Sequence, residues 1–148
     1  MSNIDHTLDM AANIKGAFAV AIVDYESGMT LGSRGGSAEF DLDVAAPGNS
    51  EVMRAKLDVM QKLGLRNEGI EDILINLSTQ YHLIRPIQGA PDEKLFLYLA
   101  LNKAQANLAM ARRDLRVIEQ EFFMSHPSGP GGRNGDSQAF FPSTAGQR

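Results

Sequence analysis

The chain has 148 residues, 43% hydrophobic and 22% charged, which is long enough for one domain with a hydrophobic core and short for two. Acidic residues outnumber basic ones by 18 to 14, and the net charge of -4 argues against a nucleic-acid-binding protein, which needs a concentrated basic face. The absence of cysteine excludes disulfides, thiolate zinc sites and a cysteine nucleophile.

The sequence carries no signal that would direct it into or across a membrane. Its first residues lack the basic and apolar segments of a signal peptide. No stretch approaches the roughly 18 uninterrupted apolar residues that a membrane-spanning helix requires. We therefore expect a cytoplasmic protein with no membrane insertion.

The pattern of apolar residues changes period several times along the chain, which indicates alternating helices and strands. The predicted order is a helix at 4–14, strands at 17–23 and 29–34, a helix at 50–65, strands at 70–77, 81–87 and 95–99, and a helix at 102–123. This order predicts an α/β fold in the broad sense, with one sheet covered by helices.

The first predicted strand alternates larger side chains with alanine. Phe18, Val20 and Ile22 would lie on one face of it, and the other face would carry mostly small side chains that let a helix approach closely. The following segment, residues 24–28, has the turn chemistry of a hairpin and ends in a glycine.

The later elements differ in how their apolar residues are distributed. In the helix predicted at 50–65 the apolar residues spread too widely for one sheet face, so we expect two sides of it to be covered. The strand at 95–99 is apolar on both faces, as in the centre of a sheet. The last helix carries one apolar stripe, formed by Ala104, Leu108, Ala111, Leu115, Ile118 and Phe122.

Residues 125–148 have the composition of a disordered tail. Gly, Pro and Ser supply 12 of these 24 residues, which leaves too little apolar surface to offset the chain entropy lost on folding. We predict a domain at 1–124 followed by this tail. Phe140, Phe141 and Pro142 form its one apolar spot, either a short docking motif or an incidental cluster.

Four segments together resemble the Roadblock/dynein light chain family. They are GAFAVAIVD at 16–24, EDILINLS at 71–78, YHLIRP at 81–86 and FLYLALNKAQANLAMARR at 96–113. The resemblance covers most of residues 4–122. It implies a five-stranded antiparallel sheet in the order α-β-β-α-β-β-β-α, with the two outer helices on one face and the middle helix on the other.

The resemblance also implies a homodimer, in which the middle strand and the middle helix meet their symmetry mates. Such pairing would protect an edge strand rich in branched residues from aggregation. The residues that would form this interface are Val52, Val59, Leu63, Ile73, Leu74, Ile75, Asn76 and Leu77.

Members of the family bind or regulate small Ras-like GTPases, and bacterial relatives commonly occur beside a small GTPase and a sensor kinase. The resemblance therefore implies a regulatory or scaffold protein that binds a small GTPase. Two alternatives stay open: a structural adaptor of a sensor-kinase or motor complex, and a small-ligand sensor. The sequence offers no clear arginine finger, so any acceleration of GTP hydrolysis would work by ordering the GTPase's own residues.

We expect no catalytic residue, cofactor or metal. The glycines near residues 28–36 lack the Lys and Ser or Thr of a phosphate-binding loop, and no Gly-x-Ser-x-Gly elbow exists. The remaining candidates are more simply explained as solvated carboxylates at Asp24, Asp41 and Asp43, isolated histidines at His6, His82 and His126, and a solvated basic face at Arg112, Arg113 and Arg116.

Overall fold

The computed structural model describes residues 3–88 and 94–125. Its elements are α1 (Asn3–Ala12), β1 (Ala17–Asp24), β2 (Met29–Gly35), α2 (Leu42–Lys62), β3 (Ile73–Asn76), β4 (Gln80–Pro86), β5 (Leu95–Asn102) and α3 (Leu108–Ser125). The order predicted from the sequence is confirmed. The predicted tail lies outside the described residues except for Ser125, the last residue of α3, so the domain boundary stays a prediction.

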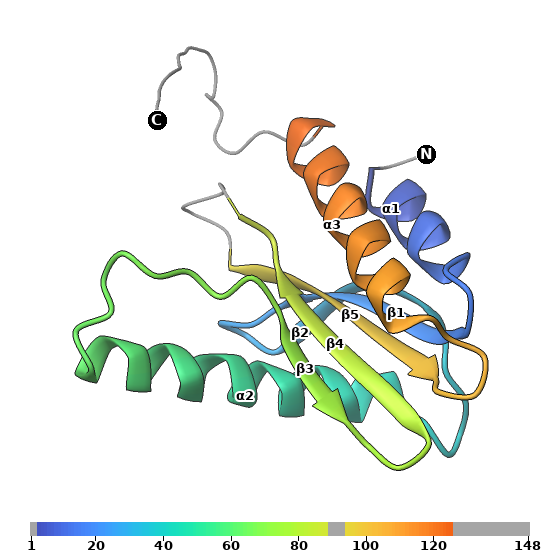
Figure 1. Ribbon diagram of the computed structural model, residues 1–148, viewed down its shortest axis with the longest axis horizontal. Coiled ribbons are helices and arrows are strands. Elements are labelled where there is room, and N and C mark those ends of the chain that lie inside the picture. Colours follow the sequence, from blue (N-terminus) through green and yellow to red (C-terminus); the bar gives the residue numbers. More distant parts are fainter. Residues whose placement is uncertain (1–2, 89–93, 126–148) are drawn as a thin grey trace.

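The five strands form one antiparallel sheet in the order β2-β1-β5-β4-β3. Figure 1 shows α1 and α3 side by side on one face of this sheet and α2 across the other. The predicted layers are therefore confirmed. No helix in the described part of the chain is long and apolar enough to cross a membrane.

The central strand β5 separates two cores. Leu97 and Leu99 pack with α1 and α3, whereas Phe96 and Tyr98 pack with α2. Every residue from Leu95 to Leu101 is buried, which explains why the strand is apolar on both faces.

The prediction for Phe18 is wrong. Val20 and Ile22 share one face as expected and pack with α1 and α3, but Phe18 packs with the core on the α2 side, where its ring meets the Phe40 ring edge-on at 4.9 Å. The cause is an irregularity in the pairing of β1 with β5 between Ala17 and Ala19, which turns Phe18 to the other face.

The start of α2 also differs from the prediction. The helix begins at Leu42 and not at Ser50, with Pro47 inside it. Asp41 caps it, since its side chain accepts a hydrogen bond from the Asp43 backbone N–H. Leu42 and Ala46 are buried against the sheet, so packing holds a turn that the Pro47-Gly48 pair would otherwise disfavour.

The last helix begins at Leu108 and not at Asn102, because two asparagines shape the chain before it. Asn102 ends β5, and its side chain accepts a hydrogen bond from the Ala104 N–H in a tight turn. Asn107 then accepts one from Met110 at the start of α3. Ala104 is exposed and outside the helix, whereas the later residues of the predicted stripe do pack against the sheet.

Candidate functional site

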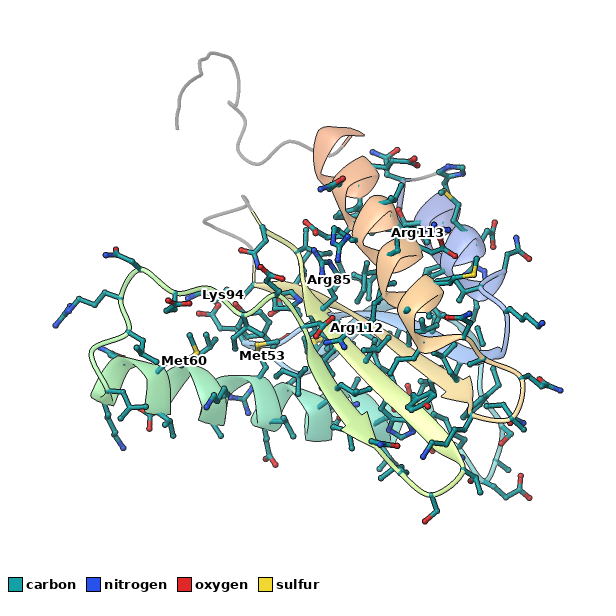
Figure 2. The ribbon with its side chains drawn as sticks, in the orientation of Figure 1. Met53, Met60, Arg85, Lys94, Arg112 and Arg113 are labelled. Atoms are coloured by element: carbon teal, nitrogen blue, oxygen red, sulfur yellow. The ribbon has the colours of Figure 1, made fainter. Side chains whose placement is uncertain are left out.

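The surface that the sequence predicts as an interface begins on α2, which lies across the sheet and extends beyond the strands (Figure 1). Met53 and Met60 are buried on its sheet side, toward which Figure 2 shows both side chains pointing. Another side of the helix carries apolar residues in solvent: Val44 is 69% exposed, Val52 39%, Val59 43% and Leu63 65%. Exposed apolar surface gathered on one helix in this way is typical of an interaction site.

Together with Gly48 and Ala55, these four residues form a continuous stripe, which we call the α2 stripe. Its members follow one another at intervals of three or four residues and are Val44, Gly48, Val52, Ala55, Val59 and Leu63. Residues at this spacing share one face of a helix. All six are exposed.

The stripe is symmetric about the middle of the helix, between Met53 and Arg54. Each residue has a counterpart at the same distance on the other side, and in two of these pairs a small residue matches a larger one: Gly48 corresponds to Val59, and Ala55 to Val52. A stripe with this symmetry can pack against an antiparallel copy of itself, because a two-fold axis through its middle brings each residue opposite its counterpart.

The other part of the predicted interface is β3, at one edge of the sheet. β3 pairs with β4 through Ile73 and Ile84 at one end and Asn76 and Tyr81 at the other. Its opposite side has no partner strand within the described residues. An edge strand with branched apolar residues is a template for pairing with another strand.

The structure brings only some of the predicted interface residues to one surface. Ile73 and Ile75 pack on the α2 side of the sheet, but Leu74 packs on the opposite side, with the α1–α3 core. Asn76 and Leu77 are exposed at the end of β3. Any contact through Leu74 would therefore involve the strand edge and not the face that carries α2.

Val44 and Gly48 were not predicted as part of this surface, because the helix was expected to begin after them. The Asp at position 41 and the apolar residues at 42 and 46 were the signals that could have shown the earlier start.

A hollow of about 530 Å³ lies beside the first turns of α2, lined in part by Phe40, Asn49, His82 and Tyr98. The Tyr98 hydroxyl is 3.1 Å from His82 Nδ1, and His82 Nε2 is 2.8 Å from the Gln80 side-chain oxygen. Both imidazole nitrogens therefore have partners, and His82 is partly buried in β4.

Burial sets the protonation behaviour of this pair. It lowers the pKa of His82 below its ordinary value of 6.5. It raises the pKa of Tyr98 to about 12, against the smaller opposing effect of a hydrogen bond with Asn49. With the histidine neutral, Tyr98 donates to Nδ1 and the Nε2–H donates to Gln80.

The other candidate residues have local roles. Asp24 accepts hydrogen bonds from the Glu26 and Ser27 backbone in the β1–β2 turn, and Asp41 caps α2. Gly35 has φ +76, and a Cβ there would lie 2.3 Å from the Phe18 carbonyl oxygen, so the glycine is needed for close packing of β2 on β1. Among the described residues no group of acidic or histidine side chains could hold a metal ion.

The arginines predicted as a solvated face behave differently from one another. Arg113 is exposed and forms an ion pair with its neighbour Asp114, at 3.5 Å. Arg112 instead forms two hydrogen bonds to Asp72, just before β3. These bonds raise the pKa of Arg112.

The arrangement of one antiparallel sheet between α2 and the α1–α3 pair defines the Roadblock/LC7 fold. Solved structures with this fold include a Roadblock/LC7 domain from Streptomyces avermitilis (TM-score 0.69, 9% identity, covering 84% of this chain and 98% of that one). Myxococcus xanthus MglB matches with TM-score 0.71 and 14% identity, over 86% of this chain and 92% of that one.

A further structure, MglB with a tetrameric arrangement, matches with TM-score 0.56 and 15% identity, over 82% of this chain and 93% of that one. No protein-family model matches the sequence, and the curated proteins contain no similar sequence. At these identities the likeness establishes the fold.

Proposed function

We propose that this protein is a homodimeric, non-catalytic platform that binds a small Ras-like GTPase and adjusts its nucleotide cycle or its location. The observation that carries the dimer is the α2 stripe, an exposed apolar surface that is complementary to an antiparallel copy of itself. In the dimer the stripe of one protomer packs along the stripe of its partner. The facing pairs are Val44 with Leu63, Gly48 with Val59, and Val52 with Ala55.

The edge strand supports the same assembly. Pairing of β3 with β3 of the second copy satisfies backbone groups that β4 leaves open and joins two sheets across the two-fold axis. It also covers Ile73 and Ile75, which are only partly buried in one chain.

Light scattering of the purified protein at micromolar concentration tests this dimer. We expect twice the mass of one chain for the wild type, and the mass of a single chain for Ile75→Asp and for Val59→Glu. Ile75 also packs within its own chain, so its substitution could act through folding. Val59→Glu avoids this problem because Val59 is exposed.

A matched control for the added charge is available on the same helix. Gln61→Glu introduces a carboxylate at an exposed position far around the helix from the stripe, and it should leave the dimer intact. A wild-type protein that is monomeric at these concentrations would contradict the proposed assembly.

Binding of a small GTPase is supported by the sequence resemblance and by the Roadblock/LC7 fold. The test is capture on immobilised protein from a lysate of the source cells, with GDP or with a non-hydrolysable GTP analogue. We expect a Ras-like GTPase, identified by mass spectrometry, to be retained more strongly in one nucleotide state. Its absence in both states would leave a structural adaptor of a sensor-kinase or motor complex as the better hypothesis.

The hollow beside His82 favours a second candidate, a small-ligand sensor. It combines aromatic rings with a tyrosine hydroxyl and an amide, the mixture typical of ligand pockets. Both histidine nitrogens are already bonded to protein groups, however, and a ligand would have to displace one of them. For this reason we rank the dimeric platform first.

A further inference from the structure

Asp72, the residue directly before β3, is held by a side chain from the last helix. Arg112 of α3 donates from Nε to one carboxylate oxygen of Asp72 at 3.0 Å and from Nη2 to the other at 2.6 Å. The Asp72 side chain is 12% exposed and that of Arg112 is 41% exposed. Two parallel hydrogen bonds between charged groups fix both distance and orientation, so they determine where Asp72 lies.

A second ion pair lies deeper between the same elements. Arg85 of β4 donates to Glu119 of α3 at 3.1 Å, and the two side chains are only 10% and 5% exposed. Arg85 also donates to the backbone carbonyl of Glu71, at 3.1 Å. The side chain of Gln88 donates to the carbonyl of Ile70, while its backbone N–H donates to Glu119.

Three consecutive residues, 70, 71 and 72, are therefore each fixed by a polar contact just before β3. Figure 2 shows Arg85 and Arg112 in the space between α3 and the β3–β4 hairpin. We call the Arg112–Asp72 and Arg85–Glu119 pairs the α3 clamp. It connects the last helix with the start of the edge strand, two parts of the chain that are far apart in sequence.

The strand itself is short and lies at the edge of the described sheet. β3 has four residues, and within the described part of the chain it pairs on one side only, with β4. Short strands at a sheet edge open more readily than the centre of a sheet, because few ladder hydrogen bonds and few buried contacts resist the opening. The contacts at residues 70–72 therefore add to the β4 ladder and to the packing of residues 73–75 in keeping β3 in place.

We propose that the α3 clamp positions β3 for pairing with a second copy, with Arg112 and Asp72 as its adjustable positioning residues. The Arg85–Glu119 pair is closed off from solvent and acts as the fixed part. Arg112 is accessible, so the strength of its bond to Asp72 sets how often β3 is in the pairing position. The effect on dimerisation rests on the proposed homodimer, whereas the effect on β3 does not.

Hydrogen exchange measured by mass spectrometry tests the clamp on the full chain. In Arg112→Gln and in Asp72→Asn, we expect the amides of β3 to exchange roughly tenfold faster, with β1 and β5 unchanged. Arg113→Gln is the matched control, since it removes the neighbouring arginine from the same helix without touching Asp72. It should leave the exchange of β3 unchanged.

The dissociation constant of the dimer, measured by sedimentation on the same variants, should rise about tenfold for Arg112→Gln and not for Arg113→Gln. The charge-swapped variant with Arg112→Asp and Asp72→Arg should recover part of the loss, which simple damage to the fold would not allow.

The outcomes separate the two proposals. Unchanged exchange at β3 in both clamp variants would overturn the clamp, and so would equal acceleration in all strands. Faster exchange confined to β3 in a wild-type protein that is monomeric would support the clamp and contradict the homodimer. Faster exchange at β3 with an unchanged dimer would overturn the link between the clamp and dimerisation.

Discussion

The environment of His82 favours its neutral form. Its ring lies edge-on to those of Phe40 and Tyr98, with centroids 5.5 Å and 5.6 Å away, and both nitrogens have hydrogen-bond partners. Protonation would place a hydrogen on Nδ1, so the tyrosine hydroxyl could no longer donate to it. Burial is the cause of the lowered pKa of His82.

The lowered pKa of His82 makes the stability of the fold dependent on pH. Because the pKa of His82 is lower in the folded chain than its ordinary 6.5, the unfolded chain binds the proton more readily. The contribution of His82 to the stability of the fold is fully present above about pH 6.5, and it is lost as the pH falls below that value. We expect the melting temperature to fall between about pH 6.5 and 5 by more in the wild type than in His82→Gln.

His6→Gln provides the control, since it removes a histidine that is exposed on α1 and has no part in the Phe40–His82–Tyr98 ring contacts. Thermal melts followed by circular dichroism at several pH values give the comparison. Parallel profiles for the wild type and His82→Gln would contradict the role assigned to the histidine.

Single residues were also the level at which the sequence was least informative. The alternation of β1 correctly predicted the faces of Val20 and Ile22, since strict alternation holds there. It failed for Phe18 because a local irregularity in strand pairing depends on the partner strand, which the segment itself does not reveal.

At the level of elements, the strands and helices with strong periodicity were predicted well and their ends were not. The start of α2 depends on a cap at Asp41 and on packing of two residues against the sheet, and this packing outweighs the local preference of Pro47 and Gly48. The start of α3 depends on the turn and cap formed by Asn102 and Asn107.

The stripe on α2 allows a test of how two helices would meet. A Cβ added at Gly48 would have no atom within 4 Å, so Gly48→Leu should be tolerated by one chain and should favour its helix. In the proposed antiparallel pairing the new side chain would clash with Val59 of the second copy. We expect the dimer dissociation constant to rise at least tenfold while the melting temperature of the dissociated chain is maintained.

The second variant in this test restores space. Val59→Ala alone should weaken the dimer slightly, and combined with Gly48→Leu it should recover much of the lost affinity. Gln61→Leu, which adds an exposed leucine elsewhere on α2, should have no effect on the dimer. A dimer that tolerates Gly48→Leu as well as it tolerates Gln61→Leu would rule out this register.

For the whole molecule, the layered arrangement followed from the sequence more securely than any single contact. A strand apolar on both faces belongs at the centre of a sheet covered on two sides, and helices with one apolar face supply the cover. The association of two chains could not be derived in the same way. An exposed apolar stripe indicates that the helix has a binding partner, but it does not identify that partner.

Thermal stability should report the association directly. Since a dimer is favoured by mass action, the melting temperature of the wild type should rise with protein concentration. That of Val59→Glu should stay constant over the same range. Calorimetry over a hundredfold range of concentration makes the comparison, and a constant wild-type value would count against a dimer that dissociates on unfolding.

The position of β5 has a consequence for how the protein is made. The pairs β1–β2 and β3–β4 are local hairpins, and within the described sheet β5 alone joins them, through contacts such as Ala17 with Leu101. At a synthesis rate of about 5–20 residues per second, the first hairpin emerges several seconds before the strand that completes its core. Folding therefore has to wait for a contact across most of the domain, which is slow in any chain. A chain interrupted before Leu95 would hold two hairpins and no shared interior, so the newly made protein is most vulnerable to aggregation just before its central strand appears.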